Sequence, residues 1–248
     1  MKKIFTGISM TLILPGLFLL PSCSKDGGRC LTPAGRVITQ VREVSGFDSI
    51  RVLDNINVIL SPGSEPRVTV EAGENIIGGI TTEIVGRELV LRNTNTCNWL
   101  RSYSSPHDVR VTATSLLKIH YDGSGNISCT DTIRSGYLKI DLWSGCGTID
   151  LKINVTNGFF LQHMGTATME LSGICNVSSV FAGDYGLLRL DRLRTGYTFV
   201  TNSSSNDCYV NANHALDATI TSIGNIYYSG DPGEIKYSIT GSGRLIRQ

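Results

Sequence analysis

Five residues recur at equivalent positions of a repeated segment and could act together: Asp150, Glu170, Arg189, Tyr209 and Tyr227. If the segments stack as neighbouring strands, Asp150 and Glu170 lie about 5 Å apart, near the carboxylate separation of retaining glycosidases. The two tyrosines would offer flat rings on which sugars can stack. The row could be an acidic catalytic pair, a binding column without chemistry, or a solvated surface in which Arg189 neutralises Glu170. We favour the solvated surface over catalysis, because any stacked repeat exposes such columns, and binding lies between the two.

Motifs for other chemistry are absent from the sequence. It contains no Gly-x-Ser-x-Gly elbow, P-loop, His-Glu-x-x-His or Cys-x-x-Cys motif. The four histidines fall in separate segments: His107, His120, His163 and His214. Three aspartates suggest a calcium cluster, but their spacing matches no calcium loop: Asp122, Asp131 and Asp141. We therefore predict no metal and no cofactor, and a protein that is not an enzyme.

The repeated segments are the elements that would position the five residues. Their starts lie 18 to 22 residues apart: Gly125, Gly147, Ala167, Gly186, Asn206, Gly224 and Gly243. The residues two positions after these starts are all apolar: Ile127, Ile149, Met169, Leu188, Cys208, Ile226 and Leu245. Alternation with a period of two predicts strands, and a fixed repeat near 20 residues predicts a solenoid.

We expect an all-β fold in which residues 36–248 form one continuous parallel β-helix with rungs of about 20 residues. Each rung would also carry a second strand rich in β-branched and aromatic residues, such as Tyr197–Val200. Stacked rungs bury their inward side chains as ladders and satisfy each strand's backbone hydrogen bonds. Fainter repeats that start at Pro66, Arg87 and His107 extend the pattern toward the N-terminus.

The corners and the last edge carry two further signals. A small residue at the start of a rung lets the chain turn sharply. The final unpaired strand needs protection from edge-to-edge pairing, which Arg244 and Arg247 could provide.

Residues 1–22 have the features of a leader for export. Lys2 and Lys3 precede an apolar run over residues 8–20, which is short for a membrane span of about 20 residues. The run ends at Leu20–Cys23, which resembles the lipobox of bacterial lipoproteins, so we expect Cys23 to be lipidated. Residues 23–35 would then form a polar tether that holds the protein to the outer membrane, on its periplasmic or cell-surface side.

The charge balance argues against nucleic acid as a partner. Without Lys2 and Lys3, 20 basic residues face 21 acidic ones, and no cluster of basic residues occurs. Binding to phosphate backbones needs clustered lysine and arginine.

Six cysteines remain after Cys23, an even number that permits disulfides in an exported chain. Cys129 and Cys208 fall on inward positions, but four rungs separate them, roughly 19 Å at about 4.8 Å per rung. No disulfide reaches that far. Cys30 and Cys97 lie in irregular polar stretches and are our candidate pair.

Several segments resemble one known family. They are Phe47–Val52, Asn55–Gly63, Val68–Glu71, Asn75–Ile77, Glu88–Leu91 and Gly123–Ile127. Over about residues 40–245 the chain resembles the head GIN domain family, exported proteins or lipoproteins described as putative auto-transporter adhesins. The resemblance implies a right-handed parallel β-helix-like fold. It carries over no functional residues, because the function of the family is not established.

Together these observations predict a cell-envelope lipoprotein that presents a β-helical surface for adhesion to carbohydrate or protein. The alternative is a polysaccharide-active hydrolase or lyase that uses Asp150 and Glu170. The sequence does not decide the ligand, the membrane leaflet or the oligomeric state.

Overall fold

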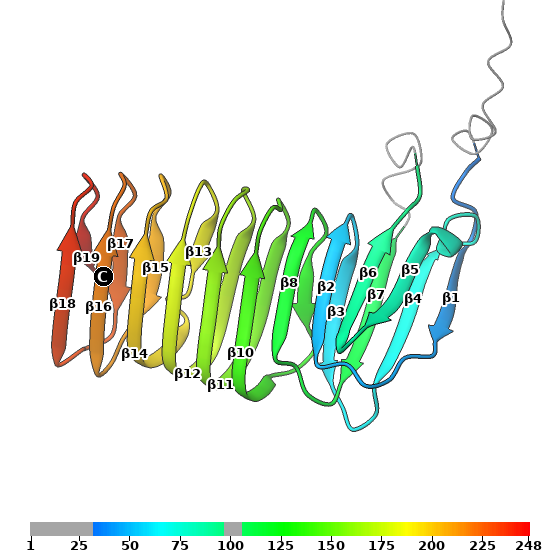
Figure 1. Cartoon of the computed structure of the whole chain (residues 1–248), viewed down its shortest axis with the longest axis horizontal. Helices are drawn as coiled ribbons and strands as arrows, with labels where there is room; N and C mark the ends of the chain where they lie inside the picture. The colour runs from blue at the N-terminus through cyan, green and yellow to red at the C-terminus, as the bar shows by residue number, and fades with distance from the viewer. Residues whose placement is uncertain (1–31, 97–105) are drawn as a thin grey trace, which may run out of the picture.

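The computed structural model describes residues 32–96 and 106–248. These residues form an all-β solenoid whose strands stack along one long axis, with one short 3₁₀ helix, η1 (Ile77–Gly79) (Figure 1). Regular rungs extend from β8 (Lys118–Gly123) to the C-terminus, and an irregular part precedes them. The prediction of an all-β solenoid with rungs of about 20 residues is confirmed.

Each regular rung contributes to two sheet faces. The first face contains β9 (Ile127–Cys129), β13 (Leu187–Arg189), β15 (Cys208–Asn211), β17 (Ile226–Ser229), β19 (Leu245–Arg247) and the first halves of β11 (Thr148–Gln162) and β12 (Thr168–Ala182). The second face contains β8, β10 (Ile133–Leu142), β14 (Leu193–Asn202), β16 (Ala215–Ile220), β18 (Glu234–Ile239) and the second halves of β11 and β12. All these neighbouring strands run parallel.

The inward side chains form the apolar ladders that the repeat predicts. Successive partners on the first face are at most 1% exposed: Ile127, Ile149, Met169, Leu188, Cys208 and Ile226. Within β11 the buried positions change from odd to even numbers between Val155 and Gly158. The strand bends there from the first face to the second, so one long strand serves both faces.

The part before β8 departs from the predicted continuous coil. β2 (Ser49–Asp54) and β3 (Asn57–Pro62) extend the parallel stack, and β6 (Glu88–Asn93) and β7 (His107–Ala113) lie beyond them. However, β4 (Arg67–Gly73) runs antiparallel between β1 (Val37–Arg42) and β7, and β5 (Ile80–Val85) runs antiparallel to β6. The repeats predicted from Pro66, Arg87 and His107 are therefore strands, but they do not follow one another as parallel laps.

The reason is that apolar alternation identifies a strand without giving its direction. Gly86, at the turn between β5 and β6, has a φ of +65°, a left-handed conformation that suits a tight hairpin. That hairpin reverses the chain where a solenoid lap would have continued.

Small residues at the rung starts are needed because neighbouring rungs approach closely. A Cβ on Gly147 would lie 2.0 Å from the carbonyl oxygen of Gly125, and a Cβ on Gly125 would lie 2.0 Å from that of Ile56. Neither glycine has a left-handed φ. The predicted need for a small residue holds at these two corners, but its cause is contact with the adjacent rung and not a special backbone conformation.

Candidate functional site

The predicted column lies on the outward side of the first face. Asp150, Glu170, Arg189, Tyr209 and Tyr227 are register partners on successive strands. The Tyr209 and Tyr227 rings stack, with centroids 5.0 Å apart and planes 11° from parallel. The Arg189 guanidinium lies 5.4 Å from the Tyr209 ring centroid. The structure thus brings the five side chains into one row, while their role in binding stays a prediction.

Glu170 in this row has a different basic partner from the one that the sequence suggested. Arg192 Nη2 donates to Glu170 Oε2 at 2.9 Å, whereas Arg189 Nε lies 3.9 Å from Asp191 Oδ1. Glu170 is therefore neutralised by Arg192 and not by its register partner.

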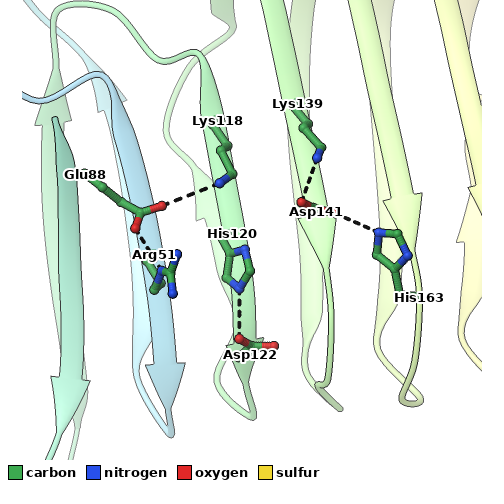
Figure 2. A network of polar contacts seen from close by, with 8 residues as sticks. All are labelled: Arg51, Glu88, Lys118, His120, Asp122, Lys139, Asp141 and His163. Carbon is green, nitrogen blue, oxygen red and sulfur yellow. Dashed lines mark hydrogen bonds and ion pairs between the residues drawn. The ribbon is translucent and has the colours of Figure 1, made fainter. Parts of the chain in front are cut away.

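A second polar group lies on the outward side of the second face, where four strands and the residue that follows β11 contribute charged or polar side chains (Figure 2). Glu88 accepts a hydrogen bond from Arg51 Nε at 2.8 Å and lies 3.7 Å from Lys118 Nζ. His120 Nε2 and Asp122 Oδ2 are 2.8 Å apart. We call this group, together with the three residues described next, the polar cluster.

Asp141 is the most enclosed member of the polar cluster. Its side chain is 6% exposed and contacts Lys139 Nζ at 2.8 Å and His163 Nε2 at 3.0 Å. Burial raises the pKa of this carboxyl, but the hydrogen bonds and charges of Lys139 and His163 outweigh burial and leave the pKa below its ordinary value. Asp141 is thus an ionised carboxylate that fixes two neighbouring side chains.

Aromatic rings adjoin the polar cluster through His163. Trp143 stacks on the His163 ring with centroids 4.2 Å apart, and the Phe181 ring centroid lies 5.6 Å from that of His163. Tyr137 and Phe159 form a second pair at 5.3 Å. Together with two residues of β14 these rings form the aromatic surface of the second face: Tyr137, Trp143, Phe159, Phe181, Tyr197 and Phe199. Half or nearly half of the Trp143 and Phe199 side chains is exposed, at 44% and 50%.

Comparison with family models places this architecture in a known group. The model described as putative auto-transporter adhesin, head GIN domain, matches residues 46–232. The chain belongs to this family. The description of this head GIN domain family points to a protein of the cell surface or envelope.

Solved structures share the fold of this head GIN domain protein. A putative adhesin from Bacteroides fragilis aligns with a TM-score of 0.80 and 19% identity, covering 88% of this chain and 100% of that chain. A protein described as a putative lipid binding protein from Parabacteroides distasonis gives a TM-score of 0.69 and 21% identity, covering 86% and 97%. A putative adhesin from the same organism gives 0.67 and 15%, covering 87% and 99%. Comparison with curated proteins finds no match.

The polar cluster and the aromatic surface were not anticipated from the sequence. The register partner of Asp141 on the next rung is Leu161, and His163 lies two residues further along the chain, directly after β11. One feature of the sequence could have indicated the aromatic surface. In the second half of β11, outward Phe159 lies between buried Gly158 and Phe160. A search of that strand for outward aromatic residues, rung by rung, would have found the surface.

The remaining predicted sites are only partly covered by the described residues. Cys23, Cys30 and Cys97 lie outside them, so lipidation and the disulfide stay predictions. Four cysteines within residues 32–96 and 106–248 are free: Cys129, Cys146, Cys175 and Cys208. In the same ranges no group of three metal-binding side chains converges, and no helix is long and apolar enough to cross a membrane. Asp122 pairs with His120 Nε2 and Asp141 with Lys139 Nζ, and neither belongs to a group of three possible ligands in these ranges.

Proposed function

We propose that this head GIN domain is a non-catalytic module of the cell envelope that binds carbohydrate through its second face. The observation that carries the proposal is the aromatic surface beside the polar cluster. Sugar rings have apolar faces that pack on aromatic side chains and hydroxyl groups that hydrogen-bond to charged and polar groups. The second face offers both kinds of contact side by side.

The regular stacking gives this surface a repeating spacing. Neighbouring strands in a sheet lie about 4.8 Å apart, so outward residues on successive rungs form rows. Phe159 and Phe199 lie in the same row with Ser179 between them. A rigid row of this kind fits an extended polymer better than a small molecule, which supports a polysaccharide as the ligand. A protein ligand is the other outcome that a binding experiment can return.

The proposal includes a lipid anchor at Cys23 and export to the outer membrane. It is supported by the lipobox-like Leu20–Cys23 and by the polar residues that follow. A Cys23→Ser variant should move from the membrane fraction to the soluble fraction of the envelope. Equal membrane retention of both forms would contradict the anchor.

Binding is tested with the full chain, expressed with its own leader and purified in mild detergent, on an array of bacterial and host polysaccharides. Trp143→Ala and Phe181→Ala should weaken retention of any glycan that the wild type binds. Tyr185→Ala is the matched control, because Tyr185 is 62% exposed and lies outside the aromatic surface. A Tyr209→Ala, Tyr227→Ala variant tests the first-face column in the same assay. Absence of glycan binding across the array would overturn the proposal.

One observation supports an enzyme as the second candidate: Asp150 and Glu170 are register partners on adjacent strands. Incubation of the full chain with the same polysaccharides should then release new reducing ends or unsaturated products. An Asp150→Asn, Glu170→Gln variant should abolish that release. Release at an unchanged rate by this variant would remove the acidic pair as the catalytic site.

A further inference from the structure

The C-terminal end of the solenoid leaves an apolar layer uncovered. β18 pairs only with β16, and β19 pairs only with β17, among the described strands. Three inward positions of β18 continue ladders that are fully buried one strand earlier, yet these side chains are exposed: Ile235 41%, Tyr237 66% and Ile239 40%. With Leu245 of β19 they form the terminal apolar layer, around a hollow of about 520 Å³.

The opposite end of the solenoid is finished differently. β1 is the last strand of the first face there, and its inward positions opposite Val70 and Val68 hold Gln40 and Arg42. On the second face the last described strand is β5, which pairs only with β6. Arg42 Nη2 donates to the carbonyl oxygen of Ile77 in η1 at 3.3 Å. Polar residues at the inward positions of an edge strand discourage further strand addition. β18 has no such residue at the equivalent positions. On β19, Arg247 lies opposite Tyr228 and pairs with Asp231.

The segments outside the described residues join the chain far from this layer. Residues 32, 96 and 106 lie at the end of the solenoid that holds β1, β6 and β7 (Figure 1). Ten strand spacings separate β1 from β19 in the first-face stack, roughly 48 Å at about 4.8 Å each. The points at which these segments join the described residues therefore lie far from the terminal apolar layer.

We propose that two copies of this chain associate through their C-terminal ends, with β18 of one copy antiparallel to β18 of the other. A two-fold axis through Tyr237 places Ile235 of one copy opposite Ile239 of the second, and Tyr237 opposite its own equivalent. The same axis places Lys236 opposite Ser238 and Glu234 opposite Thr240, so no like charges meet. The layer is thus complementary to itself.

Such an interface is isologous and closes at two copies, because the two-fold axis pairs the β18 edge of each copy with that of the other and leaves neither free. It satisfies the backbone groups of the open edge and continues the apolar ladders across the contact. The contact area is the cross-section of a single rung, which places it among small, reversible interfaces. We therefore expect a monomer–dimer equilibrium that depends on concentration.

The first test is sedimentation velocity of the full chain in mild detergent over a wide concentration range. Wild type should pass from monomer to dimer, and Ile239→Lys should raise the dissociation constant by about tenfold or more, since lysine on an edge opposes pairing. Phe199→Lys is the control, because Phe199 is similarly exposed but lies away from the end. Circular dichroism verifies that each variant is folded. A monomer at every concentration, or polymers longer than a dimer, would overturn the proposal.

The second test identifies the occupant directly. A photoreactive benzoylphenylalanine in place of Tyr237 should give a species of twice the chain mass, cross-linked to residues 235–239 of the second copy. The same group in place of Tyr185 should give none. Cross-linking of position 237 to another protein, or to residues 1–31 of its own chain, would show that a different occupant covers the layer.

Discussion

Substitution of Gly147 by alanine tests how closely the rungs approach each other. Gly147 begins a rung on the first face, and its backbone N–H donates to the hydroxyl of buried Tyr121 at 3.0 Å. An added Cβ would lie 2.0 Å from the carbonyl oxygen of Gly125 and 2.3 Å from the Tyr121 hydroxyl oxygen. Backbone and a fully buried side chain form both contacts, so neither neighbour can move aside without disturbing the adjacent rung.

The magnitude follows from two opposing effects. Overpacking in a well-filled interior destabilises by about 1–3 kcal/mol. Replacement of glycine by alanine also restricts the unfolded chain, which stabilises the folded protein by about 0.4–1 kcal/mol. We expect Gly147→Ala to lower the free energy of unfolding by about 1–2 kcal/mol. Gly136→Ala is the matched control, because a Cβ there would meet nothing within 4 Å and the residue has no left-handed φ. It should be neutral or slightly stabilising.

Urea unfolding of the full-length variants, followed by far-ultraviolet circular dichroism, measures the difference as a shift in midpoint at constant slope. The free energies of unfolding of the two alanine variants should differ by about 2 kcal/mol. Equal midpoints for Gly147→Ala and Gly136→Ala would refute the reasoning, since they would show that the carbonyl of the preceding rung does not approach Gly147 closely.

Three further predictions concern buried polar groups and thiols. Tyr121→Phe should lower the free energy of unfolding by about 2 kcal/mol, because it leaves the Gly125 carbonyl and the Gly147 N–H without their hydroxyl partner. Tyr185→Phe, measured by the same urea unfolding, should change the free energy of unfolding little. The pKa of Asp141 is lowered in the folded protein, so its ionised carboxylate stabilises the fold at pH values above its ordinary pKa of 3.8, and this contribution is lost as the pH falls through the folded pKa. The difference in the free energy of unfolding between wild type and Asp141→Asn should therefore shrink in acid. A difference that grows in acid would contradict the lowered pKa. Burial, with a smaller contribution from Asp207, raises the pKa of Cys208 to about 12, so iodoacetamide should modify exposed Cys146 first and Cys208 only after unfolding, as peptide mass spectrometry can show.

The regular rungs could be predicted from the sequence because their signal is local and repeated. One apolar ladder, from Ile127 to Ile226, follows from counting residues between glycine-rich corners. The row from Asp150 to Tyr227 follows from the same count, since register in a parallel stack depends only on rung length. The pairing of Arg192 with Glu170 could not be predicted from this count, because Arg192 lies in the neighbouring corner and not in the row.

The irregular N-terminal part could not be predicted in the same way. Strand direction is decided by turns and by distant partners, and β2 pairs with β6 and β8 across long stretches of chain. The polar cluster depends on this arrangement, because Arg51 meets Glu88 only once β2 lies beside β6. Its other half, Asp141 and His163, depends on where the chain leaves β11.

The most direct test of the proposed function is the dissociation constant of the glycan that binds most tightly, measured by titration calorimetry for matched variants. Loss of one stacking ring is worth about 0.5–1.5 kcal/mol beyond its buried area, so Trp143→Ala should weaken binding by about tenfold. Tyr185→Ala and Tyr209→Ala should bind as wild type. An unchanged constant for Trp143→Ala, or a loss confined to Tyr209→Ala, would contradict binding by the second face.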